Sequence, residues 1–342
     1  AFAQGLVIGT INNSGTINLH GGTFMVPGRL QSSISGNTGK VNINNTYVSV
    51  DGDNTLAGLV DVAEGGELAV NASQIAGGSI DNHGTLDLGD GTLRYAVKDS
   101  AATMSGKTVV TGAVTNNSTI TQQDLTINAD KSLTTPAGSI TITNAIVNEG
   151  TLTLTGTSAI FNNAVKNTST QANGKTVIDG TITANKLLDQ RIEVKDSTDS
   201  LTLDVDLLGI GDADKNKVVN AGTVVLTADT TTNDVASKSV ADTLEKVIEG
   251  GKITVAGNIT SDVDNLKGEV TNAANTLTLT GGTDATHLDT LTVDIKGAGN
   301  VNIGTGTDAS ARAADGEIAR VTENIVVIVD RGVGLGFASP MR

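Results

Sequence analysis

The chain contains no cysteine and no tryptophan, and its remaining aromatic residues are 4 Phe and 2 Tyr among 342 residues. Without cysteine it can form neither disulfide bonds nor thiolate metal sites. A compact globule of this size normally uses aromatic side chains to fill its core. Here the core has to be built from Val, Ile, Leu and Ala, which suits the thin interior of a solenoid.

Basic residues are scarce as well. The 22 Lys and Arg are outnumbered by 37 Asp and Glu, and the net charge of −15 is spread along the chain. Nucleic acids and anionic membranes are bound by basic surfaces, so this balance argues against both as partners. The longest apolar run, at 325–329, is far shorter than the roughly 18 residues of a membrane helix, and no membrane-spanning segment is predicted.

What the chain does have is a recurring eleven-residue phrase. Its clearest copy, at 146–156, reads IVNEGTLTLTG: an apolar pair, an Asn, a Gly-Thr step, an alternating strand and a closing Gly. Close copies lie at 11–21 and 80–89, and looser ones at 114–120, 218–226 and 270–281. Six copies of one phrase identify a repeat protein.

The phrase has a direct structural interpretation. Alternation of apolar and polar residues puts Leu152 and Leu154 on one face of a strand, and Thr151, Thr153 and Thr155 on the other. Gly and Asn supply the backbone conformations of tight corners. Short strands separated by corners are what a parallel β-helix repeats, with turns about 4.8 Å apart. Asn residues at one corner can also stack on their counterparts in the next turn, as amide ladders do.

The spacing of the repeats is uneven. The corner Asn residues stand at positions 13, 82, 116, 148, 220 and 272, so the intervals are 69, 34, 32, 72 and 52 residues. Either the solenoid is irregular, or the copies mark different sides of the coil. Between residues 60 and 200, alternating strands are predicted at 67–70, 85–88, 107–110, 124–127, 139–143, 151–155 and 176–178.

The pattern changes towards the C-terminus. Residues 184–191 are charged and lack alternation, which predicts a short helical insert or a boundary. We therefore assign residues 1–200 to an irregular right-handed parallel β-helix of the all-β class. Residues 201–342 are assigned to a smaller, more globular β-rich part that ends in a strand at 323–330.

One short helix is expected in the C-terminal part, at 240–249. Val240, Leu244, Val247 and Ile248 are spaced as one face of a helix. Ser239 and Asp242 resemble a capping box, and Gly250-Gly251 supply a stop.

Motifs for catalysis are weak. His20, His83 and His287 stand apart, and we interpret each as a solvated strand or turn residue. Neither H-E-x-x-H nor G-x-S-x-G occurs. Gly106-Lys107-Thr108 and Gly174-Lys175-Thr176 resemble the end of a phosphate-binding loop, but the first glycine of that motif is missing and no helical pattern follows. We interpret both as turns and expect no enzyme.

One acidic segment has part of a metal-binding pattern. Asp212, Asp214 and Asn216 have the D-x-D-x-N spacing of a calcium loop, but Lys217 replaces its Gly and Thr223 replaces its distal Glu. An ordinary acidic turn is our interpretation, and calcium binding is the alternative. No other cofactor is expected.

Two other patterns leave alternatives open. Asp204 and Asp206 would project together from one strand, as the paired carboxylates of solenoid enzymes do. Thr-x-Thr pairs such as Thr141 and Thr143 recur, and flat arrays of this kind can bind ice, but outward Thr is also what strands prefer. The pairs are unevenly spaced, which argues against an ice-binding array.

The repeat itself carries a resemblance. The phrase (Ile/Val)-x-Asn-x-Gly-Thr-Leu-x-Leu-x-Gly at 11–21, 80–89 and 146–156 resembles repeats of autotransporter passengers and filamentous-haemagglutinin-type adhesins. The resemblance covers residues 1–200 well and the rest loosely. It implies a right-handed β-helix exported to a bacterial cell surface for adhesion, aggregation or matrix building. The absence of cysteine suits such a location, and Ala1-Phe2-Ala3-Gln4 resembles the end left by a cleaved signal peptide.

Two functions follow as hypotheses. The first is a non-enzymatic bacterial surface or extracellular protein that binds a protein or glycan on a cell surface, or builds a matrix. The second is a self-assembling subunit of an extracellular filament, sheath or surface layer, because open solenoid ends offer unpaired strand edges. For assembly into a homopolymer, the candidate residues are Ile325, Val326, Val327, Ile328 and Val329. This apolar strand would add to another copy's edge, or else form a last core strand.

Overall fold

The structure, a computed structural model, describes residues 10–19, 28–36, 38–168, 174–209, 217–228, 243–244, 246–262, 265–280, 289–291, 294–296, 300–303 and 325–327. Its strands form an all-β parallel solenoid of about 12 turns, which confirms the predicted fold class. The chain divides into two compact units, Ala1–Thr176 and Val177–Arg342, whereas the sequence pattern placed a division after residue 200.

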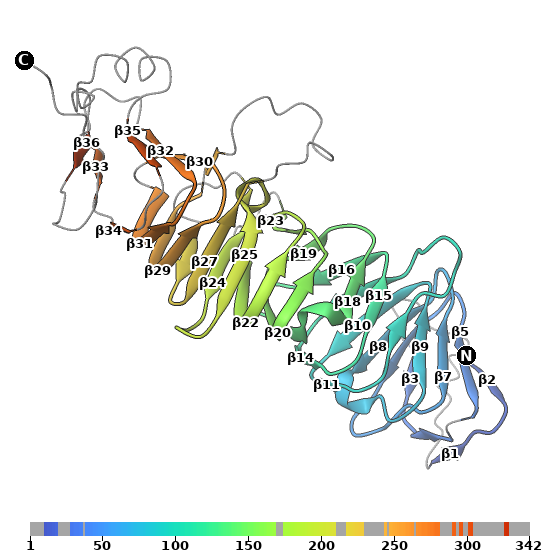
Figure 1. The fold of residues 1–342 in the computed structure, drawn as a ribbon. Helices are drawn as coiled ribbons and strands as arrows, with labels where there is room; N and C mark the ends of the chain where they lie inside the picture. Colours follow the sequence, from blue (N-terminus) through green and yellow to red (C-terminus); the bar gives the residue numbers. More distant parts are fainter. Residues whose placement is uncertain are drawn as a thin grey trace, which may run out of the picture. The chain divides into compact units, whose positions relative to one another are not determined.

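Three parallel sheets form the first unit, and Figure 1 shows their strands stacked side by side from blue to green. Sheet 1 contains β2 (Thr16–Leu19), β5 (Lys40–Ile43), β7 (Leu59–Val62), β9 (Ser79–Asn82), β12 (Val97–Lys98), β15 (Ile120–Gln122) and β18 (Ile140–Ile142). Sheet 2 contains β3 (Gly28–Leu30), β6 (Tyr47–Val50), β8 (Glu67–Asn71), β10 (Thr85–Gly89), β13 (Lys107–Val110), β16 (Asp124–Ile127), β19 (Ile146–Asn148) and β21 (Val165–Lys166). Sheet 3 contains β11 (Gly91–Leu93), β14 (Ala113–Asn116), β17 (Ser132–Pro136) and β20 (Thr151–Phe161).

From β9 to β20 the chain visits sheets 1, 2 and 3 in that order in every turn. In the earlier turns the third side is formed by β1 (Ile11–Asn12), β4 (Ile34–Ser35) and single parallel bridges that join Ile34, Leu56 and Ile75. Two short 3₁₀ turns, η1 (Ala72–Gln74) and η2 (Ala137–Ser139), connect strands at the corners. Each turn is therefore a triangle of short strands.

Turn length varies while strand register is kept. On sheet 1, Ile80 pairs with Val97, Val97 with Ile120 and Ile120 with Ile140, so successive turns contain 17, 23 and 20 residues. The strands stay aligned because the loops between them absorb the difference. This is one reason why the repeat intervals in the sequence share no common divisor.

The core follows the alternation of the repeat. Leu152 and Leu154 are fully buried, and Thr151, Thr153 and Thr155 between them are half-buried, as predicted. Leu152 pairs with Leu133 of the preceding turn, so apolar side chains stack in rows along the interior. Full burial of one such Leu contributes roughly 1.5–3 kcal/mol. The strands predicted between residues 60 and 200 are all confirmed, although β20 (Thr151–Phe161) and β22 (Lys175–Ala184) each continue six residues beyond the predicted end.

The second unit contains longer strands that bend across two sides of the coil. Its described elements are β22 (Lys175–Ala184), β23 (Leu188–Asp189), β24 (Arg191–Val194), β25 (Ser200–Asp204), η3 (Val205–Leu208), β26 (Val218–Asn220), β27 (Thr223–Thr227), β28 (Thr243–Leu244), β29 (Ile248–Val255), β30 (Ile259–Asp262), β31 (Leu266–Asn272), β32 (Thr276–Thr280), β33 (Asp289–Leu291), β34 (Asp294–Lys296), β35 (Asn300–Ile303) and β36 (Ile325–Val327). Strands beyond residue 200 also stack in parallel, as in the rows β25-β27-β29-β31-β34 and β28-β30-β32-β35.

The helix predicted at 240–249 is wrong. Its described residues include β28 and the start of β29, and residues 240–242 lie outside the described part. Leu244, Lys246 and Ile248 are all buried, so the inward residues alternate in a strand-like period of two. The helical spacing that included Val247 was misleading, because Val247 is only half-buried and the buried place belongs to Lys246. Residues 184–191, where a helical insert was one alternative, contain β23 and the start of β24.

Gly250 and Gly251 do not stop a helix. They lie inside β29 with φ angles of 88° and 59°, in the left-handed region where glycine is favoured. On one side of this bulge β29 pairs with β26, and on the other side it pairs with β27. The two glycines therefore allow one strand to turn from one side of the coil to the next.

Candidate functional site

The corner asparagines are buried, and both the Oδ1 atom and the Nδ2 atom of each side chain make hydrogen bonds. All six have exposed fractions between 0% and 5%. In Asn148 the Oδ1 atom accepts a hydrogen bond from the backbone N–H of Gly150 at 3.1 Å, and Nδ2 donates to the carbonyl of Lys175 at 2.9 Å. The same acceptor contact, two residues along the chain, is made by Asn13, Asn82, Asn116 and Asn220. Five of the six amides thus close their own corner and tie it to a neighbouring turn, whereas both amide atoms of Asn272 bond the backbone of Asn275 in the same corner.

A Gly-Lys step in the sequence accompanies most of these corner asparagines. The Nδ2 atoms of four corner asparagines donate to the carbonyl of a lysine in a following turn, and that lysine always follows a glycine. The pairs are Asn13 with Lys40, Asn82 with Lys107, Asn148 with Lys175 and Asn220 with Lys252. The Gly-Lys steps that resemble phosphate-binding loops are therefore strand starts, and Lys107 and Lys175 are the first residues of β13 and β22.

The corner asparagines mark different sides of the coil. Asn82 ends a strand of sheet 1, Asn148 ends one of sheet 2 and Asn116 ends one of sheet 3. Asn82 does not stack on another corner Asn: its Nδ2 donates to Gln122 Oε1 at 2.6 Å. The uneven intervals therefore arise because the copies mark different sides of the coil, which was one of the two alternatives. The expected ladder of stacked Asn side chains is wrong for the Asn82 corner, because loops of different length place the corners apart.

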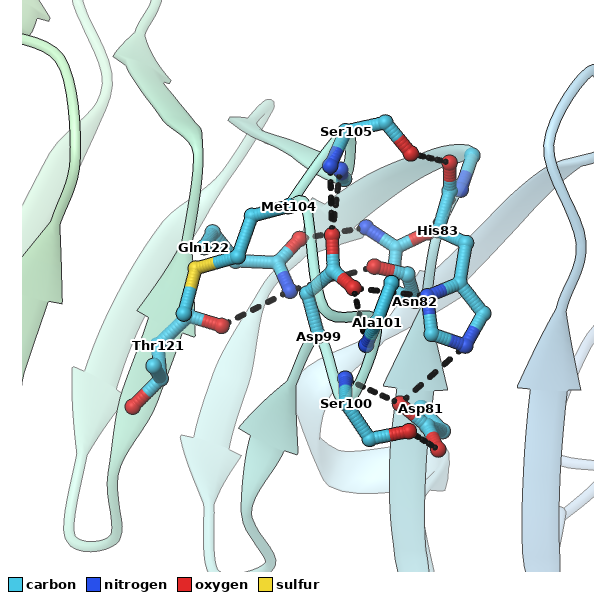
Figure 2. A network of polar contacts seen from close by, with 12 residues as sticks. Asp81, Asn82, His83, Asp99, Ser100, Ala101, Met104, Ser105, Thr121 and Gln122 are labelled. Carbon is cyan, nitrogen blue, oxygen red and sulfur yellow. Dashed lines mark hydrogen bonds and ion pairs between the residues drawn. The ribbon is translucent and has the colours of Figure 1, made fainter.

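A polar cluster lies at the corner that follows β9, and Figure 2 shows it from close by. Its centre is Asp99, which is 4% exposed. Asp99 accepts backbone hydrogen bonds from Ala101 at 3.0 Å, Ser105 at 2.7 Å and Gly106 at 2.7 Å. The Nδ1 atom of His83 lies 2.6 Å from its Oδ1 atom. Four contacts therefore converge on one buried carboxylate.

These contacts determine the charge state of Asp99. Burial raises the pKa of a carboxyl group, but the backbone N–H groups of Gly106, Ala101 and Ser105 and the contact with His83 outweigh it and leave the Asp99 pKa below its ordinary value. Asp99 is consequently ionised at neutral pH and holds the loop at 99–106 against the preceding turn.

His83 is held between two carboxylates. Its Nε2 atom lies 3.4 Å from Asp81 Oδ1, and its side chain is 22% exposed. His83 is thus a turn residue, as predicted, but only partly solvated, whereas His20 and His287 lie outside the described residues. A general base needs a ring nitrogen that can reach a substrate. Since both ring nitrogens of His83 face carboxylates, the cluster serves to join strands.

A second pair of carboxyl groups lies on the outward side of sheet 2. Burial raises the pKa of both Glu67 and Asp87. The charge of Asp87 and its hydrogen bond raise the Glu67 pKa further. The same hydrogen bond lowers the Asp87 pKa, but burial has the larger effect. The Lys107 charge lowers both values, and the pKa of Tyr47 is raised by burial and then by these acids. The physical picture is one proton held between neighbouring carboxyl groups.

The structure describes only some of the site residues that were predicted from the sequence. Asp212, Asp214 and Asn216 lie outside the described residues. Asp204 and Asp206 do not form a pair on one strand, because Asp204 Oδ1 caps η3 by accepting the backbone N–H of Asp206 at 3.0 Å. Ile325, Val326 and Val327 form β36, which pairs in parallel with β33, and Ile328 and Val329 are outside the described part.

The part of the chain that the structure describes has no group of three or more His, Asp or Glu placed to hold a metal ion. Within the same ranges, no helix has the length and apolar character to cross a membrane.

Comparison with protein-family models, curated proteins and solved structures gives no match. The repeat and the parallel solenoid are therefore the features from which a function has to be inferred.

Proposed function

We propose that this protein is a non-enzymatic β-solenoid of the bacterial cell surface or extracellular space, acting in adhesion or matrix building. The observation that carries the proposal is how its buried polar groups are used. The corner asparagines, Asp99 and His83 are all engaged in joining one turn to another. A protein whose buried polar residues join one turn to the next is suited to presenting surface rather than to chemistry.

The repeat supports the same proposal. The phrase at 146–156 that resembles autotransporter passengers and filamentous-haemagglutinin-type adhesins supplies both the inward Leu pair and the corner Asn of the coil. Its partner would be a protein or glycan on a cell surface. The net charge of −15 favours a dispersed, soluble exterior between such contacts.

Location and binding can be tested separately. On intact cells of the source organism, we expect antibodies to label this protein and added protease to remove it. Purified chain on beads should bind cells or arrays of surface proteins and glycans, whereas Leu154→Asp chain, with disrupted turns, should bind less. Protein that protease reaches only after cell lysis would refute the surface location, and equal binding by both chains would refute adhesion through the folded solenoid.

Self-assembly into a filament, sheath or surface layer is the second candidate. Among the described residues, β1, β2 and β3 of the first turn each pair on one side only. Such edges can accept a strand from another copy. Size-exclusion chromatography with electron microscopy separates the two functions, because discrete rods support an adhesin and regular fibres support a polymer.

A further inference from the structure

Lys246 is buried inside the second unit. Its side chain is 1% exposed and occupies an inward place between Leu244 and Ile248. The Nζ atom donates hydrogen bonds to the carbonyl oxygens of Leu188 at 3.1 Å and Gln190 at 3.0 Å. These carbonyls lie 58 and 56 residues earlier in the chain. One amine therefore connects the segment after β28 with the segment around β23.

The protonation state of this amine matters for the contact. A lysine ammonium has three N–H donors, whereas the neutral amine has two N–H donors and a lone pair. The two carbonyls at Nζ match the donors of the neutral form. A buried ammonium also loses its hydration, and only a nearby opposite charge can offset that loss.

Among the described residues, the charge that acts on this amine is that of Asp189. Asp189, on β23, raises the Lys246 pKa through its charge, but burial has the larger effect and lowers the pKa to about 7. The other acidic groups on elements next to β28 are Asp206 on η3, which packs against β28 and β23, and Asp262 on β30, which pairs with β28. Neither has a resolved effect on Lys246.

We propose that Lys246 is a proton-operated switch within the solenoid, whose neutral amine joins the β28 segment to the β23 segment and whose protonation favours release of that contact. The proton is taken up by the Nζ lone pair, and the ammonium is better solvated when the β28 segment opens. The inference does not depend on the surface location or on adhesion.

The direction of the pH effect follows from linkage. A lysine in an opened, solvated segment has a pKa near 10.5, above the value of about 7 in the closed structure. Between these two values opening takes up a proton, so opening becomes roughly tenfold easier for each pH unit that the pH falls. Below pH 7 the amine is protonated in both states, and the effect levels off.

Two measurements on the full chain test the switch. In the NMR spectrum of protein labelled with [13C]lysine, we expect one lysine Cε signal to titrate near pH 7 and to vanish in Lys246→Met. Hydrogen exchange of β23 and β28 peptides, corrected for intrinsic rates, should show roughly 15-fold greater protection at pH 8.5 than at pH 7, because half of the closed-state amine is already protonated at pH 7.

Two variants serve as controls. Lys246→Met has a similar length and no titrating group, so its corrected protection should not change between pH 7 and 8.5. Asp189→Asn removes the nearby negative charge and should move the titration to lower pH. If Lys246→Met fails to fold, the titration of the wild-type chain decides alone. A Lys246 signal that titrates above pH 10, or a Met variant with the same pH dependence, would overturn the switch.

Discussion

At the scale of single residues, the fold depends on buried polar side chains that bond in two directions. Asn suits a corner because its carbonyl accepts from its own chain and its amide donates to a neighbouring turn, as Asn148 does with Gly150 and Lys175. Asp or Ala in that place would lose the donor. A buried backbone group left without its partner costs about 1–3 kcal/mol.

Asp99→Asn tests the ionised carboxylate. Because the folded pKa of Asp99 is depressed, its contribution to stability is present above the unfolded value of 3.8 and is lost as the pH falls through the folded value. At pH 7 we expect the variant to lose roughly 2–3 kcal/mol, since an ionised acceptor of backbone N–H groups is removed. Urea unfolding at pH 7 and pH 3 should show the difference between variant and wild type shrinking in acid. A constant difference would contradict the role of the charge.

Asp87→Asn should act in the opposite direction. The folded pKa values of Asp87 and Glu67 are raised, so their stabilising contribution is present below the unfolded values and lost as the pH rises through the folded ones. Above the folded pKa values, where the shared proton has been lost, the variant relieves repulsion between two carboxylates. We expect a gain below about 1 kcal/mol, because the pair is partly exposed to solvent. The same urea titrations measure it, and destabilisation at pH 7 would refute the shared-proton picture.

The inward direction of the repeat Leu residues gives a third prediction. Leu154→Asp should unfold the turns next to β20, because a buried unpaired carboxylate costs several kcal/mol. Thr153→Asp, one residue away and half-buried on the outward side, should be tolerated. Circular dichroism melts of both variants provide the comparison. Equal losses of stability in the two variants would show that Leu154 does not point inward and Thr153 outward.

At the scale of elements, each corner requires close approach of two backbones. A Cβ atom on Gly106 would lie 1.9 Å from the carbonyl oxygen of Asn82, and one on Gly174 would lie 1.8 Å from that of Asn148. These glycines precede the strand-starting lysines. The Gly-Lys step is therefore the complement of the corner Asn, and both are needed for neighbouring turns to stack.

Gly106→Ala tests this complement. The added methyl group has to displace backbone, so we expect a loss of about 1–3 kcal/mol, typical of overpacking. Gly138→Ala is the matched control, because a Cβ atom there meets nothing within 4 Å. Thermal unfolding of both variants should separate them clearly. Similar melting temperatures would mean that the corner relaxes without cost.

At the scale of the whole molecule, the solenoid is built from contacts between neighbouring turns, so its stability is close to a sum over turns. Parallel pairing continues from β25 to β34, which makes the part beyond residue 200 an extension of the same architecture. The strand β36 belongs instead to a two-stranded sheet with β33. Removal of such a small sheet should leave the longer rows intact.

Truncation after Thr322 tests whether 325–329 serves assembly. For a full chain that assembles into fibres, we expect the shortened chain to keep its β-sheet circular dichroism and to lose the fibres in electron microscopy, because β36 pairs only with β33 among the described strands. Loss of the β signal would identify a core strand of the fold. Fibres from a folded, truncated chain would exclude the segment from assembly.

The sequence by itself determined the local features of this protein. Alternation has a period of two, so Leu152 and Leu154 could be placed inward without knowledge of their neighbours, and Asn148 with Gly150 marked a corner because their backbone preferences are local. Local patterns gave no sign that Lys246 is buried. A charged residue is normally solvated, and the carbonyls that accept its hydrogen bonds lie 56 and 58 residues away.

Only the tertiary structure decided which turns meet. Successive turns of 17 and 23 residues bring Asn82, Asp99 and Gln122 to one corner, where His83 joins them. The extra residues lie in polar loops without periodicity, so no pattern in the sequence records the register. Register is determined by the stacking of apolar rows over the whole coil, and polar neighbours across turns follow from it.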